Sequence, residues 1–192
     1  MNAMADEIDP RQTELITLIG FRGCGKTTVG RKLAERLGWE FLDTDEMVVA
    51  EAGRSISDIF SSDGERAFRL MEAEALDRAL AGRRRVISVG GGAVLARRNR
   101  KALRSIGGCI WLTATAEELF RRITEDEKTA EQRPALTPLS GAVEVETLLQ
   151  MRLPVYEATA DYVIGTMNLS VDQVVDEIMQ RLGLNTSMKK GC

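Results

Sequence analysis

The sequence contains no histidine among its 192 residues. That absence excludes Ser-His-Asp and Cys-His nucleophile systems, zinc sites built on histidine, and histidine as a general base. Proton transfer must therefore fall to Asp, Glu, Lys, Tyr or Cys side chains. The length and the hydrophobic content of 44% are typical of a single globular core.

Cysteine is scarce as well, and positive charge is in deficit. Cys24, Cys109 and Cys192 are widely spaced and form no C-x-x-C pair, so neither a disulfide framework nor a metal knuckle is expected. The net charge of −3 argues against binding nucleic acid through bulk positive charge. The acidic first fourteen residues do not resemble a signal peptide, and no apolar run approaches the roughly 20 residues of a membrane span. We therefore expect a cytoplasmic protein without nucleic-acid or membrane partners.

Short apolar runs alternate along the chain with longer segments of helical spacing. Strands this apolar, each followed by a helix, predict a parallel sheet covered by helices on both faces. We expect strands at 15–19, 40–42, 85–89, 109–112 and 162–164. We expect helices at 26–37, 63–81, 93–105, 115–124, 143–158 and 170–182. One domain is expected over residues 15–183, between a mobile N-terminal tail over 1–14 and a C-terminal tail over 184–192.

The segment GFRGCGKT at 20–27 fits the pattern G-x-x-x-x-G-K-[ST] and lies between a predicted strand and a predicted helix. Its glycines let successive N–H groups curl around phosphate oxygens at a helix N-terminus. Lys26 can reach the β- and γ-phosphates, and the Thr27 hydroxyl can bind Mg²⁺. The strand–loop–helix context disfavours a glycine-rich turn that matches by chance. Cys24 lies near Lys26, so its thiol is a candidate for inhibitory alkylation or, alternatively, a small residue filling the loop.

Three classes of protein use such a loop: small-molecule or nucleotide kinases, switch GTPases and nucleotide-gated interaction modules. The chain lacks an Asn-Lys-x-Asp guanine motif and a buried strand followed by Asp-x-x-Gly, which disfavours a GTPase. The third predicted strand runs into three glycines at 90–92, where a mechanical ATPase would carry an acidic residue. A small-molecule kinase is therefore favoured, and a catalytically inactive nucleotide-binding protein is the alternative from another class.

Carboxylates and glycines follow two of the predicted strands. Asp43 and Asp45 come at the end of the second strand, and open α/β sheets bind ligands beyond the carboxyl ends of their strands. These carboxylates can orient hydrated Mg²⁺ and accept a proton from an attacking hydroxyl, or one of them can cap the next helix. The N–H groups at 90–92 can approach a substrate carboxylate or ring, or simply make a tight turn.

Three arginines are candidates for binding anions. Arg69 lies four residues after Glu65, so an ion pair on a solvated helix is the alternative. Arg133 lies in a polar stretch, predicted to form a lid over 124–138, that could bring it to the transferring phosphate or be a plain surface loop. Arg152 lies late in a predicted helix and could equally be a surface charge.

The ordered set of motifs resembles the shikimate kinase family. The resemblance covers residues 15–183 and rests on the phosphate loop, Asp43-Thr44-Asp45, Gly53 to Ile56, Gly64-Glu65, Phe68-Arg69 with Glu72, the glycines at 90–92, Arg133-Pro134, and Arg152 with Tyr156. It implies a three-layer α/β/α P-loop NTPase fold with a five-stranded parallel sheet, a lid and substrate-binding helices. It also implies transfer of the γ-phosphate of ATP to the 3-hydroxyl of shikimate, with Mg²⁺, by a monomer. Another kinase of the same fold, acting on gluconate or a nucleotide, is the alternative.

The resemblance further implies roles for individual residues. The ATP phosphates would be bound by Gly23, Cys24, Gly25, Lys26, Thr27 and Thr28. Thr27 would also bind the metal, and Asp43 would order its water shell. Asp45 would hold the shikimate hydroxyls and serve as the base, while shikimate would further be bound by Arg69, Gly91 and Arg152. Arg133 would close over ATP as the lid cation, and Arg122 would lie against the adenine. The catalytic set is therefore expected to be Lys26, Asp45 and Arg133.

The chemistry of shikimate agrees with these roles. Shikimate is a carboxylate that bears several hydroxyls. Its pocket needs paired arginines for the anion and an aspartate for the diol, and the sequence supplies both.

Overall fold

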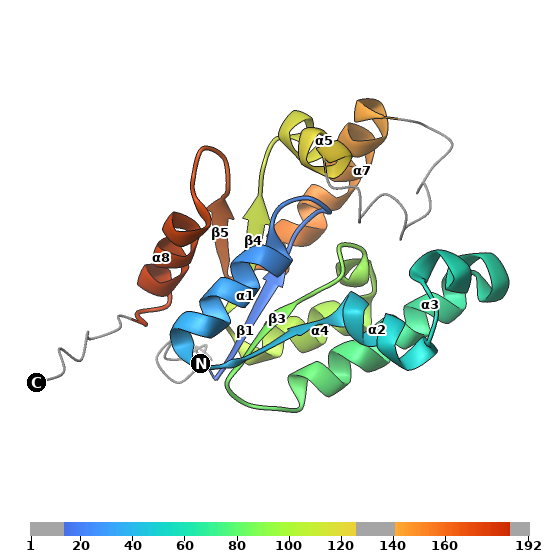
Figure 1. Ribbon diagram of the computed structural model, residues 1–192, viewed down its shortest axis with the longest axis horizontal. Helices are drawn as coiled ribbons and strands as arrows, with labels where there is room; N and C mark the ends of the chain where they lie inside the picture. The colour runs from blue at the N-terminus through green and yellow to red at the C-terminus, as the bar shows by residue number, and fades with distance from the viewer. Residues whose placement is uncertain (1–13, 126–140, 185–192) are drawn as a thin grey trace, which may run out of the picture.

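The computed structural model describes residues 14–125 and 141–184. Within them, five parallel strands form one sheet in the order β2-β3-β1-β4-β5 (Figure 1). The strands are β1 (Leu15–Ile19), β2 (Glu40–Asp43), β3 (Arg85–Ser88), β4 (Cys109–Thr113) and β5 (Tyr162–Gly165). The predicted α/β class and the five-stranded parallel sheet are confirmed.

Helices cover both faces of the sheet, because alternate side chains of each strand point to opposite faces. On one face, Ile16 and Leu18 of β1 pack in a core that includes α1 and α8. On the other, Ile19 and Ile87 pack in a core that includes α3, α4 and the end of α7. The helices are α1 (Lys26–Leu37), α2 (Thr44–Ala52), α3 (Ile56–Leu80), α4 (Arg97–Ile106), α5 (Ala116–Glu125), α7 (Ala142–Glu157) and α8 (Val171–Arg181). The predicted three layers are confirmed.

The region after β2 differs from the prediction. The helix expected at 63–81 is the second part of α3, which begins at Ile56 behind a capping box of Ser55 and Asp58. At Gly64, φ is 81°, and this residue kinks α3. Residues 44–52 form α2, for which no helix was expected. Figure 1 shows α2 and the first turns of α3 together beside the sheet, where the two helices pack on each other.

The single helix expected at 93–105 was also wrong. A 3₁₀ turn covers Ala93–Leu95, and α4 begins only at Arg97. Ala96 separates the two because its ψ of 124° is extended. The glycines at 90–92 therefore enter a tight turn before the chain becomes helical.

Glu14 and Leu184, which were expected in the two tails, each make a backbone hydrogen bond to the domain. Arg85 donates its N–H to the carbonyl of Glu14, and Leu184 donates its N–H to the carbonyl of Met179. The remaining residues of the two expected tails lie outside the described residues. So does most of the expected lid, whose first residues, Thr124 and Glu125, end α5. Among the described helices, none has the length and apolar character that crossing a membrane requires.

The fold predicts a large cost for truncating the first core. Leu33 of α1 is 0% exposed, so Leu33→Ala should lower the free energy of unfolding by about 2–5 kcal/mol. Leu70 is 58% exposed, and Leu70→Ala should change it by only about 0.5 kcal/mol. Urea denaturation of both variants measures the difference, and equal losses would contradict the assignment of Leu33 to the core.

Candidate active site

Three loops meet where the central strands end. The phosphate loop follows β1, Asp43 ends β2, and the glycines at 90–92 lie just after β3. Because β2, β3 and β1 are parallel neighbours, their carboxyl ends lie side by side. Three separate segments of the sequence thereby form one site, as the predicted sheet edge requires.

The phosphate loop has the backbone that its glycines permit. Gly23 and Gly25 have φ values of 83° and 92°, a region that residues with a β-carbon rarely adopt. The Lys26 ammonium donates to the carbonyls of Gly20 and Phe21, both at 3.0 Å, so the cation lies within the loop. Cys24 is fully buried. Its side chain therefore fills the loop as a small residue, and the expectation of an accessible, reactive thiol is not supported.

Asp43 joins the phosphate loop to the next helix. Its Oδ2 accepts a hydrogen bond of 2.8 Å from the Thr27 hydroxyl, and its Oδ1 accepts one of 3.0 Å from the N–H of Asp45. The second bond caps the N-terminus of α2. The cap alternative is therefore confirmed for Asp43, and the same carboxylate still faces the hydroxyl that was predicted to bind a metal.

The glycine turn is crowded by polar side chains. A β-carbon placed on Gly90 would lie 2.6 Å from Asp45 Oδ1 and 2.8 Å from Glu72 Oε1. One placed on Gly92 would lie 2.6 Å from an Arg69 nitrogen. Real β-carbons do not approach oxygen or nitrogen so closely, so a side chain at either position would displace these groups. The glycines therefore let the polar side chains and the turn share one small volume.

Arg69 is held by two carboxylates. It pairs with Glu65 at 3.2 Å, as the alternative expected, and also with Glu72 at 2.9 Å. Glu72 is only 1% exposed. Burial raises the pKa of the Glu72 carboxyl, and the Arg69 charge and hydrogen bond oppose that rise. Sequence reasoning gave Glu72 no role, although its i, i+3 spacing from Arg69 is the signal for such a pair.

Arg152 is not a surface charge, so that alternative was wrong. It is buried, and its guanidinium carbon lies 5.3 Å from the centroid of the Phe21 ring. Its Nη1 approaches the carbonyl of Gly91 at 3.5 Å. Tyr156, one turn later on α7, donates to the same carbonyl at 2.7 Å and stacks on Trp111 of β4. The end of α7 thus fixes the glycine turn, a role of Tyr156 that the sequence did not reveal.

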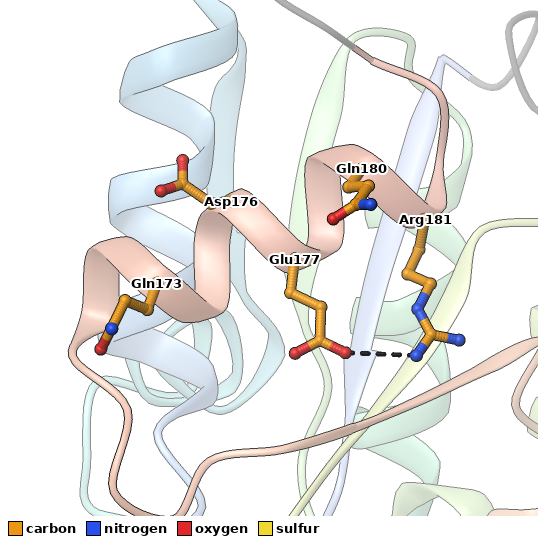
Figure 2. A pocket seen from close by; sticks show the side chains of 5 residues that line it. All are labelled: Gln173, Asp176, Glu177, Gln180 and Arg181. Atoms are coloured by element: carbon orange, nitrogen blue, oxygen red, sulfur yellow. Dashed lines mark hydrogen bonds and ion pairs between the residues drawn. The ribbon is translucent and has the colours of Figure 1, made fainter.

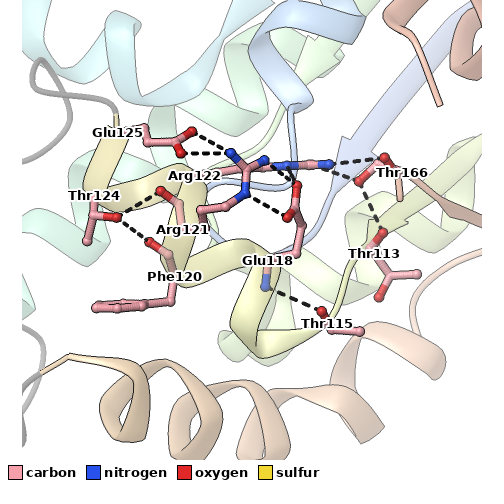
Figure 3. A network of polar contacts seen from close by, with 9 residues as sticks. All are labelled: Thr113, Thr115, Glu118, Phe120, Arg121, Arg122, Thr124, Glu125 and Thr166. Carbon is pink, nitrogen blue, oxygen red and sulfur yellow. Dashed lines mark hydrogen bonds and ion pairs between the residues drawn. The ribbon is translucent and has the colours of Figure 1, made fainter. Parts of the chain in front are cut away.

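Arg122 is anchored between α5 and the segment after β5 (Figure 3). Its Nε donates to Glu118 at 2.6 Å, and its Nη1 and Nη2 donate to the hydroxyl and the carbonyl of Thr166 at 2.9 and 3.0 Å. Hydrogen bonds from Arg121 and Arg122 lower the pKa of Glu118 to about 2. The guanidinium of Arg122 is therefore paired with a carboxylate that is ionised at neutral pH, and it is held by the three hydrogen bonds.

Two cavities contain the predicted site residues. The larger, of about 820 Å³, is lined by Gly23, Cys24, Gly25, Lys26, Thr27, Thr28, Asp43, Asp45 and Arg122, among others. The smaller, of about 60 Å³, is lined by Asp45, Arg69, Gly91 and Arg152 together with Phe60, Phe68 and Glu72. The structure thus brings together every predicted residue except Arg133, which lies outside the described residues.

A further hollow on the surface of α8 carries none of the predicted residues. Figure 2 shows its lining, which is Gln173, Asp176, Glu177, Gln180 and Arg181 from that helix alone. Glu177 and Arg181, one turn apart on the helix, form an ion pair. It is a shallow feature of one helix surface and does not contribute to the candidate site.

Comparison with known proteins gives one consistent result. A family model described as shikimate kinase matches residues 22–183. Among curated relatives, the shikimate kinase of Symbiobacterium thermophilum is 46% identical over 87% of this chain and 95% of its own length. That of Enterococcus faecalis is 44% identical over 88% of this chain and 98% of its own.

Solved structures agree with the sequence relatives. Shikimate kinase from Acinetobacter baumannii in complex with shikimate superposes with a TM-score of 0.84 at 34% identity, covering 92% of this chain and 96% of that one. A gluconokinase from Sinorhizobium meliloti reaches a TM-score of 0.51 at 20% identity, a likeness that extends to the fold alone.

The buried carboxyl of Glu72 predicts a pH dependence of stability. Because its pKa is raised on folding, the folded protein retains a proton that the unfolded chain has lost. The stabilisation is full below the ordinary value of 4.5 and declines as the pH rises toward the raised one. Glu72→Gln should therefore flatten the decline in the free energy of unfolding, measured by urea denaturation from about pH 4.5 upward.

Glu65→Gln is the matched control for Glu72→Gln. It removes the exposed partner of the same arginine and should lessen the decline only slightly, because the charge of Glu65 is the smallest of the effects on the Glu72 pKa. An equal slope in Glu72→Gln and wild type would show that burial of Glu72 does not govern the pH dependence.

Proposed function

This chain belongs to the shikimate kinase family, and we propose that its larger cavity binds MgATP and its smaller cavity binds shikimate. The activity of the family is the ATP-dependent phosphorylation of shikimate. One observation carries the assignment of the cavities. Asp45 lines both of them, so a carboxylate stands at the boundary between a loop built for phosphates and a pocket built for a small carboxylate.

The nucleotide side uses the phosphate loop. The N–H groups of residues 23–28 surround the phosphates, and Lys26 exchanges its carbonyl partners for phosphate oxygens. The adenine lies near Arg122, which also lines the larger cavity. Arg133 is proposed to close over the nucleotide as the cation of the lid.

The residues beside the phosphates fit magnesium. Thr27 and Asp43 offer hard oxygen donors 2.8 Å apart, and Mg²⁺ is commonly held by one or two protein oxygens plus substrate phosphates and waters. Among the described residues, no cluster of three or more acidic or sulfur ligands forms a separate metal site. When bound, Mg²⁺ supplies positive charge that offsets the charge of the phosphates. Thr27 would bind it directly, and Asp43 would orient its waters.

The substrate side uses the two arginines of the smaller cavity. Arg152 is a buried cation over an aromatic ring, and a buried charge is stabilised by an opposite charge. The shikimate carboxylate is the partner that we propose for Arg152 and Arg69. The N–H of Gly91 adds a donor to the ring, while Phe60 and Phe68 cover its apolar face.

Asp45 is proposed to act as the base. The 3-hydroxyl oxygen of shikimate attacks the γ-phosphorus, and the bond to the bridging oxygen breaks, so ADP leaves with the electron pair. The hydroxyl proton passes to the Asp45 carboxylate. Phosphoryl transfer depends chiefly on positioning and charge neutralisation, which Lys26 and the loop N–H groups supply. We further propose that the protein acts as a monomer in the cytoplasm, without nucleic-acid or membrane partners.

Replacing the base should lower the rate of turnover. Asp45→Asn keeps the size of the side chain but removes the charge, so kcat should fall about 10²-fold, on the order of 3 kcal/mol. Shikimate-dependent release of ADP by purified protein is the measurement. Asp172→Asn, in the exposed first turn of α8, is the control and should retain full activity. Turnover of Asp45→Asn at the wild-type rate would rule out Asp45 as the base.

Removing the buried arginine should weaken substrate binding. Arg152→Ala deletes a charge-assisted contact worth about 1.5–3 kcal/mol, so the KM for shikimate should rise about 10- to 100-fold. The KM for ATP should change little. Arg152→Lys should recover part of the loss, because lysine restores the charge but cannot make the two parallel hydrogen bonds of a guanidinium to a carboxylate. Unchanged shikimate kinetics in Arg152→Ala would show that the carboxylate binds elsewhere.

A further inference from the structure

Arg22 occupies a position for which the sequence predicted no role. It lies in the phosphate loop, between Phe21 and Gly23. Among the described residues, Arg22, Asp45 and Ile56 line both the larger and the smaller cavity. The boundary between the proposed ATP and shikimate sites therefore carries one base, one apolar side chain and one cation.

The backbone around Arg22 lies close to the glycine turn. A β-carbon placed on Gly91 would lie 3.3 Å from the carbonyl oxygen of Gly20 and 3.5 Å from the Arg22 nitrogen. From the same loop, the ring of Phe21 lies 5.3 Å from the guanidinium carbon of Arg152. The loop that binds the donor phosphates and the turn that borders the acceptor thus lie so close together that one added β-carbon would fill the space between them. A side chain that starts at this contact is positioned between donor and acceptor.

The environment of the Arg22 side chain suits an anionic ligand. Its Nε is buried and makes no hydrogen bond within the part of the chain that the structure describes. Burial lowers the pKa of the guanidinium, whereas the charge of Glu144 at the start of α7 raises it. A guanidinium remains protonated at neutral pH under such shifts. A partly desolvated cation with a buried N–H donor gains more from a multivalent anion than a solvated one does.

We propose that the Arg22 guanidinium contacts the γ-phosphoryl group during its transfer from ATP to shikimate, an inference that rests on the proposed function. As the new bond forms from the shikimate oxygen to phosphorus and the bond to the ADP oxygen breaks, charge spreads over the three equatorial oxygens. Arg22 hydrogen-bonds to these oxygens and neither gains nor loses a proton. Asp45 lines the same boundary and receives the hydroxyl proton. The base therefore acts on the attacking hydroxyl, while the cation acts on the equatorial oxygens of the phosphoryl group.

This role separates Arg22 from the other cations of the site. Lys26 lies within the loop on the carbonyls of Gly20 and Phe21, a position suited to the phosphates of bound ATP. Arg69 and Arg152 line only the smaller cavity, a position suited to the shikimate carboxylate. A group that contacts the phosphoryl in transit stabilises the transition state more than either bound substrate, so its loss should change kcat rather than KM.

The test is the kinetics of Arg22→Gln with both substrates varied. We expect kcat to fall about 10²-fold, as when one donor to a developing charge is removed, with each KM within about threefold of wild type. Arg22→Lys should recover part of kcat because it restores the charge. Arg36→Gln is the matched control, since Arg36 lies at the exposed end of α1 and pairs with Asp176. It should behave as wild type.

A binding measurement gives a second readout. ADP with aluminium fluoride, Mg²⁺ and shikimate mimics the phosphoryl group in transit. Wild type should bind ADP more tightly with the fluoride than without it, and Arg22→Gln should lose about 10²-fold of that gain. Its affinity for ADP alone should be unchanged. Titration calorimetry measures both, and circular dichroism verifies the fold. If Arg22→Gln does not fold, the same comparison is made with Arg22→Lys, which should lose part of the gain.

Three results would overturn the inference. A raised KM for shikimate with unchanged kcat would make Arg22 a ligand of the substrate carboxylate. A raised KM for ATP alone would make it a ligand of the bound nucleotide. Wild-type kinetics in the variants, with the full gain in ADP affinity from aluminium fluoride, would show that Arg22 lines the cavities without contacting the phosphoryl group. Failure of wild type to release ADP with shikimate would instead contradict the proposed function, which keeps the two failures distinct.

Discussion

The absence of side chains at the glycine turn is the constraint on which the site depends. Asp45, Glu72 and Arg69 approach this turn so closely that a β-carbon at Gly90 or Gly92 would collide with them. The polar groups of α2 and α3 can therefore reach the end of β3 only because the turn is bare. Glu72 and Arg69, which also line the small cavity, lie 2.8 and 2.6 Å from where the β-carbons of Gly90 and Gly92 would be.

Asp43 shows how one side chain can serve the fold and the chemistry together. Its two oxygens are divided between the N-cap of α2 and the hydroxyl of Thr27 on α1. The cap fixes the first turn of α2, and with it Asp45, two residues later. Stability of the helix start and the placement of the proposed base are thus coupled through one carboxylate.

Much of this arrangement was predictable from the sequence because it depends on local patterns. Apolar runs located the five strands, and the phosphate loop and Asp43 were identified from their positions after strands. The prediction was wrong where the pattern is weak. In α2, Met47, Val48 and Val49 are consecutive and form no helical stripe, and the true start of α3 is given by a cap rather than by periodicity.

The side chains that long-range packing places were harder to predict. The buried Arg152 lies over the ring of Phe21, which is more than a hundred residues earlier in the chain. Arg22 borders two cavities at the place where the loop after β1 approaches the turn after β3. No spacing within either segment encodes these contacts. Arg133 lies beyond the described residues, so its role stays a prediction from sequence.

The wall formed by Arg22 and Asp45 also has a consequence for inhibitor design. Because the same side chains border both cavities, a single molecule that joins a phosphate chain to a carboxylated ring could occupy both without a long tether. A short tether gives the second group a high effective concentration once the first is bound. Such a bisubstrate compound would fill the phosphate loop, which unrelated nucleotide-binding proteins also possess, but it would gain selectivity from the shared boundary.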